Sequence, residues 1–356
     1  MNDSRVAASP CALEASDLSV VLGGRTVLDV TSLQVSPNET LVVIGPNGSG
    51  KTTLLLCLAL LLKPATGTIS YQGQPVSNGS DVLSLRRRFA VVFQEALLLD
   101  TTVWDNVTLG LRLRGFKKDD IRIRAHKWLE RFGIASLARR QARTLSGGEA
   151  KRASLARAFA LQPEVLFLDE PFTALDSPTR QALIEDFESV LWETRVTTVM
   201  VTHDRNEALM LADRVALLMN GRIRQTGSPQ EVFSYPADEE VAGFVGVGNI
   251  VRGVVSIQSG GLATVDVGGQ QLDAVSNLAA GTRVTVFIPQ EDITISLPAP
   301  GAAPSSARNH LRGRVARAFV LDSQTRVTVD CGFPLVAVIT KRSWQDLALD
   351  VGREVV

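Results

Sequence analysis

The nine residues Gly45-Pro46-Asn47-Gly48-Ser49-Gly50-Lys51-Thr52-Thr53 follow an apolar run, residues 40–44, and precede a helical-looking apolar segment, residues 54–62. They match the pattern G-x-x-x-x-G-K-[ST]. Three glycines let a backbone fold tightly around a phosphate, so that its N–H groups and the positive end of the next helix dipole face negative charge. The pattern predicts a strand, a phosphate-binding loop and a helix, in that order.

The side chains of this loop have the chemistry that a nucleotide with its magnesium ion requires. Lys51 can neutralise the β- and γ-phosphates, and the hydroxyl of Thr52 is placed to ligate Mg²⁺. Ser49 and Thr53 supply further hydroxyl and amide donors. An incidental lysine in a glycine-rich turn is the alternative, and the matching segments on both sides argue against it.

The composition is that of an ordinary globular protein. The 356 residues include 37 basic and 37 acidic side chains, and 45% of all residues are hydrophobic, so we expect no nucleic-acid partner. Cys11, Cys57 and Cys331 have no metal-type or paired spacing, which favours reduced thiols in the cytoplasm. No signal peptide is expected, and no apolar run approaches the roughly 20 residues that cross a bilayer. Any membrane role should come from a partner.

Short apolar runs alternate with helical patterns along the first two thirds of the chain. The runs at 90–93, 165–168 and 198–201 are apolar throughout, which is typical of parallel strands that are buried on both faces of an α/β core. Residues 18–35 read as an antiparallel edge, and residues 101–144 read as a helical insertion. The predicted class is α/β, a P-loop NTPase core with an antiparallel edge and a helical subdomain.

Reactive side chains stand where these apolar runs end. Asp169 and Glu170 follow one run; the aspartate can bind Mg²⁺ through water, and the glutamate can polarise an attacking water. His203 follows another run, where it can contact a γ-phosphate, and Gln94 ends the third. Alone, each would be read as a surface residue. On a sheet that also carries a phosphate loop, we interpret them as a catalytic set.

A second glycine-rich turn, Leu145-Ser146-Gly147-Gly148-Glu149, opens a helical segment. The same amides and helix dipole predict a second anion site here. A serine that only caps the helix is the alternative. One chain with two phosphate-binding turns suggests two chains that share nucleotides.

These segments together resemble the nucleotide-binding subunits of ABC transporters, over about residues 14–235. The resemblance rests on the loop at 45–53, Gln94, the turn at 145–149, Asp169-Glu170, Thr173-Ala174-Leu175-Asp176 and His203. It implies that a second copy of the chain completes a head-to-tail homodimer or pseudo-dimer that holds two Mg-ATP. Each ATP would lie between the 45–53 loop of one copy and the 145–149 turn of the other.

The resemblance also implies a role for each candidate residue. Glu170 would be the general base, and His203 would act as a switch on the γ-phosphate. Asp176 would contact the other copy across the dimer. Gln94 would lie beside the magnesium ion and act as a lever, with Asp169 as a further magnesium neighbour.

Partners and location follow from the same resemblance. In this family the helical insertion and the glutamine loop dock on integral-membrane permease subunits, and an extracytoplasmic substrate-binding protein supplies the substrate. The chain would be peripheral on the cytoplasmic face of the cell (inner) membrane and would hydrolyse ATP to energise import. The alternative class is a soluble, non-transport ABC ATPase of translation or DNA repair. Three features of the sequence disfavour it: a single ATPase core, no long coiled-coil insertion and no basic surface bias.

The sequence after residue 235 changes character. Alternating Val, Ile and Gly patterns over residues 249–297 read as a small β-barrel, and a second block of short strands follows. The two blocks resemble the all-β, OB-like TOBE region appended to several import ATPases. The predicted boundaries are an ATP-binding domain at 14–240 with a helical subdomain at about 95–160, β blocks at 246–297 and 307–356, and a linker at 298–306.

The start of the second block resembles the molybdate-binding (Mop-like) module of molybdate and tungstate uptake ATPases. A serine hydroxyl, an arginine fork and neighbouring amides suit a tetrahedral dianion, so Ser306, Arg308 and Asn309 are candidate oxyanion contacts. A surface ion pair of the arginine is the alternative. The module normally runs past a lysine-containing final strand, so the pocket is expected to be incomplete. The resemblance indicates molybdate or tungstate as the substrate. Import of sulfate, sugar or polyamine is the nearest alternative. A third interpretation is that the C-terminal region acts as a stand-alone oxyanion sensor.

One departure from the family pattern gives a testable prediction. Leu22 stands before the Gly23-Gly24 turn, where these subunits usually carry an aromatic residue that stacks on adenine. Leu22→Tyr should therefore tighten ATP binding. An ATP titration of the variant beside the wild-type chain checks this, and an unchanged or weaker affinity would contradict it.

Overall fold

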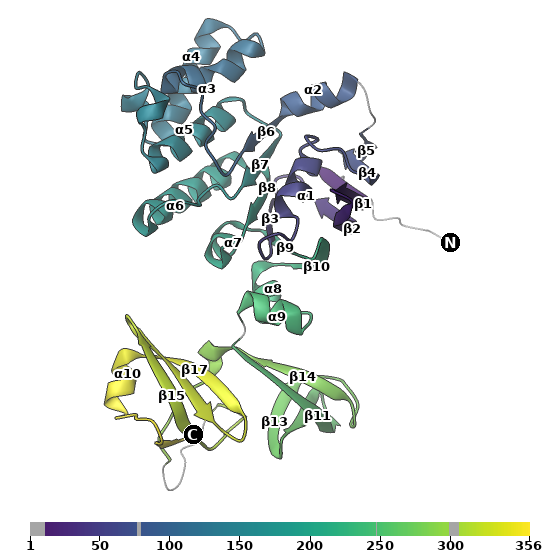
Figure 1. The fold of residues 1–356 in the computed structure, drawn as a ribbon, viewed down its shortest axis with the longest axis vertical. Helices are drawn as coiled ribbons and strands as arrows, with labels where there is room; N and C mark the ends of the chain where they lie inside the picture. Colours follow the sequence, from purple (N-terminus) through teal and green to yellow (C-terminus); the bar gives the residue numbers. More distant parts are fainter. Residues whose placement is uncertain (1–10, 77–79, 247, 299–305) are drawn as a thin grey trace. The chain divides into compact units, whose positions relative to one another are not determined.

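A computed structural model describes residues 11–76, 80–246, 248–298 and 306–356 of the chain. The chain divides into two compact units, Met1–Val232 and Phe233–Val356, whose elements are labelled in Figure 1. The N-terminal residues 1–10 and most of the predicted linker, residues 299–305, lie outside the described residues.

A six-stranded sheet forms the centre of the first unit, in the order β10-β9-β3-β8-β7-β6. The pairs β9–β3, β3–β8, β8–β7 and β7–β6 are parallel, and β10 is antiparallel to β9. Every residue of β3, β7 and β8 is buried, as their apolar sequences predict. The strands are β3 (Thr40–Ile44), β6 (Phe89–Val92), β7 (Val165–Asp169), β8 (Thr197–Thr202), β9 (Arg214–Met219) and β10 (Arg222–Gly227).

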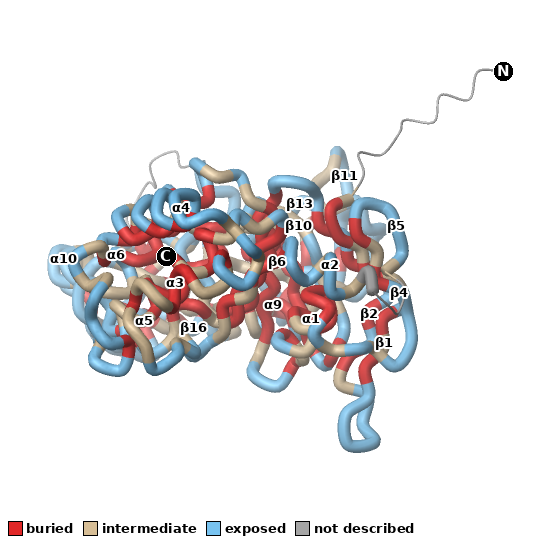
Figure 2. The backbone as a smooth tube through the Cα atoms, turned by 90° about the horizontal axis from the view of Figure 1, so that it is seen from above, coloured by how far each residue is buried: buried red, intermediate tan, exposed pale blue. Residues whose placement is uncertain are grey.

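The predicted antiparallel edge is a second sheet, in the order β2-β1-β4-β5. Its strands are β1 (Leu13–Leu22), β2 (Arg25–Val35), β4 (Thr66–Tyr71) and β5 (Gln74–Pro75). One apolar core joins this sheet, the main sheet and the helix that follows the phosphate loop, with Leu18, Leu54 and Phe167 among its buried members. This interior is red in Figure 2.

The helix after the loop, α1 (Lys51–Leu58), is shorter than the apolar run suggests. Leu60 adopts a left-handed φ of 61° and its N–H donates to the Cys57 carbonyl, so the chain turns away from the helix before Pro64. The remaining helices of this unit are α2 (Ser80–Arg88), α3 (Val103–Leu113), α4 (Lys118–Arg131), α5 (Gly147–Ala160), α6 (Ser177–Thr194), α7 (Arg205–Leu211) and α8 (Pro229–Ser234), the last continuing two residues into the second unit.

The helical layer consists of α3, α4 and α5, which lie together beside the β6 edge of the sheet (Figure 1). An aromatic cluster fixes α4 and α5 to α6. The ring centroids of Trp128 and Phe159 are 4.8 Å apart, and those of Phe159 and Phe187 are 6.1 Å apart. Large buried rings therefore fill the interface, and Arg131 and Arg152 add polar contacts to Glu193 and Asp186 of α6 at its edge.

The second unit contains two four-stranded antiparallel sheets, in the orders β13-β12-β11-β14 and β17-β16-β15-β18. The predicted all-β accessory domain is confirmed, with the helices α9 (Glu239–Val245) and α10 (Lys341–Asp346) as additions. The strands are β11 (Asn249–Ser259), β12 (Leu262–Val267), β13 (Gln270–Val275), β14 (Arg283–Ile288), β15 (Gly313–Leu321), β16 (Gln324–Asp330), β17 (Pro334–Thr340) and β18 (Glu354–Val355).

The two sheets share one apolar core, to which Val251 and Leu272 contribute from the first block and Val327 and Ala337 from the second. The buried Asn249 joins them, because its side-chain amide donates to the carbonyls of Ile288 and Val336 at 3.1 and 2.9 Å. The first block is thus not the self-contained barrel that its pattern suggests. Buried side chains of its sheet pack in the same core as those of the second block.

No helix in the parts of the chain that the structure describes is both long enough and apolar enough to cross a membrane.

Candidate nucleotide-binding and catalytic site

The phosphate-loop sequence connects β3 to α1, as predicted. Gly50 caps α1 with a φ of 99°, and a Cβ atom at this position would lie 2.8 Å from the backbone oxygen of Val27. Only glycine fits such a place without displacing the neighbouring strand. The N-terminal amides of α1 are therefore presented at the loop, where they favour an anion.

Lys51 is almost fully buried, with 6% of its surface exposed. Its Nζ donates to the loop's own carbonyls, those of Gly45 at 2.9 Å and Pro46 at 3.1 Å. Burial lowers the pKa of Lys51, while the carboxylates of Glu170 and Asp169 act to raise it. The ammonium is thus held inside the loop, in a place where an anionic oxygen would offset the cost of its burial.

Ser49 supplies a second indication of an anion-binding site. Its Oγ is buried and has no hydrogen-bond partner among the described residues. Buried hydroxyls in folded proteins are nearly always paired. A phosphate oxygen in the loop would supply the acceptor that this hydroxyl lacks.

The candidate magnesium ligands come together from two elements. The Thr52 hydroxyl, at the start of α1, donates to Oδ1 of Asp169, at the end of β7, over 3.0 Å. Burial raises the pKa of Asp169, and the hydrogen bond from Thr52 opposes this. Two hard oxygen donors fit Mg²⁺, which usually takes one or two protein groups and completes its shell with water and phosphate oxygens. Among the described residues no cluster of three or more His, Cys, Asp or Glu side chains offers a fuller metal site.

Gln94 lies at the same edge of the sheet. It follows β6, whose Val92 pairs with Leu168 of the neighbouring strand, so Gln94 and Asp169 both leave the sheet at its carboxyl edge. The Gln94 carbonyl accepts a hydrogen bond from the buried Nζ of Lys151. Sequence reasoning did not foresee this contact, which joins residues 57 positions apart.

Glu170 and His203 are in direct contact, which their separate motifs do not predict. His203 Nδ1 lies 3.2 Å from Oε2 of Glu170, and the Thr173 hydroxyl donates to the same carboxylate oxygen at 3.2 Å. The parallel pairing of β7 with β8 produces this arrangement, because both residues follow neighbouring strand ends. Glu170 also adopts a left-handed φ of 43°, an uncommon conformation that is concentrated at functional sites.

The segment after His203 contains a buried carboxylate that sequence reasoning missed. Glu207 is 3% exposed and accepts a hydrogen bond of 2.6 Å from the hydroxyl of Thr202. Asp204 caps α7 and pairs with Arg180 of α6 at 3.2 Å. These contacts fix the backbone on both sides of His203. The only sequence signal was a glutamate in the first turn of the following helix.

The second glycine-rich turn begins α5. Ser146 accepts a hydrogen bond from the Glu149 amide, and the Glu149 carboxylate accepts one from the Ser146 amide at 2.7 Å, which is a capping box. The capping role that the sequence left as the alternative is therefore present. Asp176 caps α6 in the same way, through the Thr179 amide at 3.0 Å. The two helix starts pack closely, since a Cβ atom at Gly148 would lie 2.8 Å from the Thr179 methyl group.

The three candidate oxyanion residues are exposed in the second unit. The side chain of Asn309 is engaged by β13: its Oδ1 accepts from the Asp273 amide at 2.7 Å, and its Nδ2 donates to the Asp273 carbonyl at 2.9 Å. The amide of Asn309 thus anchors the second block to the first. Ser306 and Arg308 stay the predicted contacts for an anion. In the first unit, Leu22 lies at the end of β1 and is 48% exposed.

Comparisons with known proteins agree with this geometry. The family model described as ABC transporter matches residues 28–173, and the model described as TOBE domain matches residues 305–356. The molybdate/tungstate import ATP-binding protein of Pyrococcus horikoshii is 36% identical over 326 residues, which is 91% of each chain. The sulfate/thiosulfate import ATP-binding protein of Bradyrhizobium diazoefficiens is 38% identical over 318 residues, or 86% of this chain and 89% of the relative.

Two solved structures are similar to the first unit. One is cbiO1 from Clostridium perfringens, part of the cbiONQ ABC transporter complex, with a TM-score of 0.60, 28% identity and coverage of 67% of this chain and 96% of that one. The other is the ATP-binding cassette MJ0796, a dimer in a post-hydrolysis state with ADP and Pi bound, with a TM-score of 0.56, 27% identity and coverage of 61% and 98%.

The buried Glu207 predicts a pH dependence of stability. Burial raises its pKa from the usual 4.5 to about 7. Between these values the folded protein holds a proton that the unfolded chain has lost, so the free energy of unfolding falls as the pH rises through this window. Glu207→Gln has no titrating group at this position. Its free energy of unfolding should therefore fall by about 1–3 kcal/mol less than that of the wild type between about pH 5 and about pH 8. Urea unfolding at the two pH values measures this, with the exposed Glu188→Gln as control. Equal losses in wild type and Glu207→Gln would contradict it.

Proposed function

Because this chain belongs to the ATP-binding subunits of ABC importers, we propose that it holds Mg-ATP in the 45–53 loop and hydrolyses it with Glu170 and His203. The observation that carries this assignment is the convergence of Lys51, the Thr52–Asp169 pair and the Glu170–His203 pair at one edge of the parallel sheet. A phosphate-binding cradle and a carboxylate–imidazole pair are the parts that phosphoryl transfer to water requires.

The mechanism follows from the position of each group. The loop amides and Lys51 would bind the β- and γ-phosphates, and the Ser49 hydroxyl would donate to a phosphate oxygen. Thr52, Asp169 and the Gln94 side chain would hold magnesium, which supplies charge neutralisation when bound. Glu170 would take a proton from the water that attacks the γ-phosphorus. The bond to the β-γ bridging oxygen then breaks, leaving ADP and inorganic phosphate.

His203 has a place in this scheme through its contact with Glu170. An imidazole that holds the carboxylate fixes its orientation toward the attacking water, and the exposed side of the ring is available to the γ-phosphate. Thr173 steadies the same carboxylate from the other side. Two contacts would fix the position of His203 after β8: the Thr202–Glu207 hydrogen bond and the Arg180–Asp204 ion pair.

A second copy of the chain would complete the nucleotide site. The Ser146 hydroxyl is engaged in its own helix cap, but Gly147 at the start of α5 is exposed, and the helix dipole favours a phosphate there. Asp176 lies at the adjacent start of α6 and would contact the other copy. The dimeric state of the related cassette with ADP and Pi supports this arrangement.

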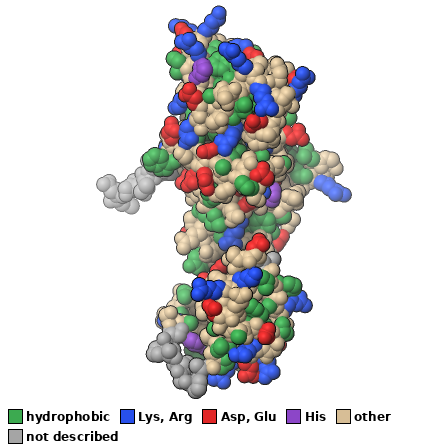
Figure 3. All heavy atoms as spheres, turned by 90° about the vertical axis from the view of Figure 1, so that its left-hand side faces the viewer, with side chains coloured by type: hydrophobic (Ala, Val, Ile, Leu, Met, Phe, Trp, Pro, Cys, Tyr) green, Lys and Arg blue, Asp and Glu red, His purple; other side chains and the backbone are tan. Residues whose placement is uncertain are grey.

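The membrane partners would dock on the helical layer. The segment after Gln94 exposes about half of the side chains of Leu97 and Leu99, an apolar surface suited to a permease helix. The chain would then be peripheral on the cytoplasmic face of the membrane, and an extracytoplasmic binding protein would deliver the substrate. Basic and acidic side chains are interspersed on the face drawn in Figure 3, so that face does not carry the single-sign basic patch typical of nucleic-acid binding.

For the substrate we propose molybdate or tungstate. The molybdate/tungstate relatives and the exposed Ser306 and Arg308 at the start of the second β block support this choice. Sulfate is the second candidate, because the sulfate/thiosulfate relatives have the same level of identity. Both are tetrahedral dianions, so discrimination between them would have to come from the size of the anion and not from its charge.

The hydrolytic mechanism predicts that Glu170→Gln lowers ATP hydrolysis by about 10²- to 10⁴-fold, the usual worth of a general base. ATP-dependent dimerisation should persist, because the phosphate loop and the 145–149 turn are unchanged. Phosphate release and light scattering measure the two properties, with the exposed Glu130→Gln as control. Loss of dimerisation with hydrolysis intact would contradict the assigned roles.

The substrate proposal predicts a difference between oxyanions. Tungstate or molybdate should raise the melting temperature of the full wild-type chain more than that of Arg308→Ala, and sulfate should have no effect, because Arg308 would bind the larger anion directly. The neighbouring Arg312→Ala is the matched control. Equal shifts for wild type and Arg308→Ala would remove Arg308 from the site and favour the sulfate or sugar alternative.

A further inference from the structure

Two cations of α5 hold the backbone of the segment that follows β6. The Lys151 Nζ donates to the Gln94 carbonyl. The guanidinium of Arg157 donates to the carbonyls of Ala96 at 3.1 Å and Leu97 at 2.9 Å. All three acceptors are main-chain atoms, so the contacts position the segment whatever its side chains do.

The two cations hold the first four residues of the segment from points about 9 Å apart along α5, because Lys151 and Arg157 are separated by six helical positions. This part of the segment is not an extended strand: the chain bends at Gln94 and Glu95, and Leu97 has a left-handed φ of 43°. One helix therefore fixes a bent piece of backbone at Gln94 and at Leu97.

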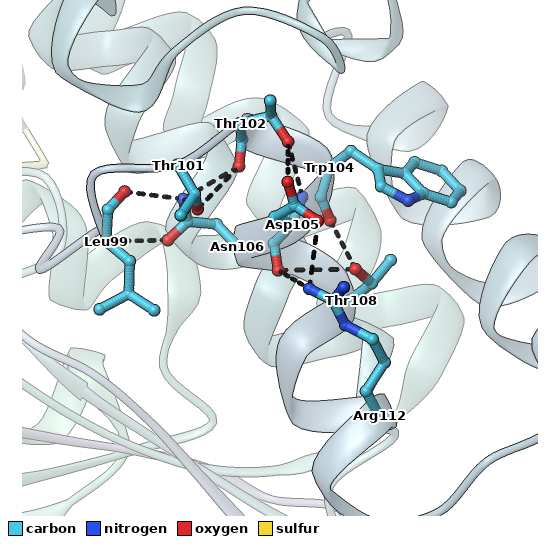
Figure 4. A network of polar contacts seen from close by, with 8 residues as sticks. All are labelled: Leu99, Thr101, Thr102, Trp104, Asp105, Asn106, Thr108 and Arg112. Atoms are coloured by element: carbon cyan, nitrogen blue, oxygen red, sulfur yellow. Dashed lines mark hydrogen bonds and ion pairs between the residues drawn. The ribbon is translucent and has the colours of Figure 1, made fainter.

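The rest of the segment is held by the start of α3, as Figure 4 shows. The buried Asn106 accepts from the Leu99 amide at 2.7 Å and donates to the carbonyls of Leu99 and Thr102, each at 3.0 Å. Residues 94–102 are thus bonded along their length to the helical layer, while their N-terminal end continues directly from β6. The segment is a joint between the sheet and the helical layer.

Lys151 is the contact of this joint that lies nearest to β6 in the chain, through the Gln94 carbonyl. It is only 6% exposed, and a buried ammonium requires hydrogen bonds and nearby negative charge. The Gln94 carbonyl supplies the hydrogen bond, and Asp169 and Glu170 attract the same ammonium. Lys151 also lies in the same helix as the Ser146 turn, five residues further on, and the helix transmits displacement as a rigid body.

We propose that Lys151 is a positioning residue that links Gln94 to the 145–149 turn, so that a nucleotide in the chain's own site changes the turn that this chain offers to the other copy. The link rests on the proposed function, because it needs Gln94 beside one nucleotide and the turn beside the second. Arg157 and Asn106 extend the joint toward the exposed Leu97 and Leu99.

Hydrogen exchange with mass spectrometry tests the link in the full chain. The parent protein carries Glu170→Gln to stop turnover and is kept at a concentration where light scattering shows a monomer. Mg-ATP should slow exchange in peptides covering residues 94–102 and also in peptides covering 145–155. In Lys151→Met, which keeps the side-chain length and removes the donor, the response at 145–155 should fall about threefold or more while that at 94–102 remains.

Matched variants separate positioning from folding. Lys151→Arg should restore the response, and Lys118→Met, an exposed lysine of α4, should leave both responses unchanged. Melting temperature and ATP affinity are measured in the same samples. If Lys151→Met keeps the full response at 145–155, or Lys151→Arg folds but does not restore it, the proposal is overturned.

The response of the Glu170→Gln parent to ATP separates a failure of the proposed function from a failure of the link through Lys151. No ATP binding by the parent would overturn the proposed function itself. ATP binding with a response at 94–102 alone would overturn only the link through Lys151.

Discussion

The parallel pairing of β7 with β8 and with β6 is the constraint on which the site depends. Neighbouring parallel strands end at the same edge, so the register that pairs Asp169 with Val201 also brings Glu170 within reach of His203. The start of α1 meets this edge through the Thr52–Asp169 hydrogen bond. Residues more than a hundred positions apart therefore share one small volume, and none of them is placed there by its local sequence alone.

Burial then sets the electrostatics of that volume. Lys51 and Lys151 are both nearly enclosed, and burial lowers the pKa of each, while the carboxylates of Asp169 and Glu170 act in the opposite direction on both. The two ammonium groups are held by backbone carbonyls, one within its own loop and one across the joint to the helical layer. Each buried ammonium is therefore balanced by hydrogen bonds to main-chain carbonyls and by the attraction of Asp169 and Glu170.

The sequence alone predicted those features whose motif and required backbone conformation lie in one continuous stretch of residues. The phosphate loop and the residues at the strand ends belong to this class, and so does the serine cap at Ser146, which the sequence offered as an alternative. The sequence did not predict contacts between separate segments, such as Lys151 with Gln94 and Glu207 with Thr202. Helical periodicity can indicate that a side chain is buried, but it does not indicate which residue the side chain contacts. The same limit applies to Asn309, whose amide pairs with the backbone of Asp273. Its local sequence suggested a ligand contact and contained no trace of the neighbouring strand.

The shared core of the second unit restricts how its two β blocks can be lost in evolution. Val251 and Leu272 share their core with side chains from beyond the linker, and Asn249 pairs with both the carbonyl and the amide of Val336. Each block therefore depends on the other to cover apolar side chains. A genetic event that removed one block alone would expose those side chains of the remaining block to water, which favours aggregation.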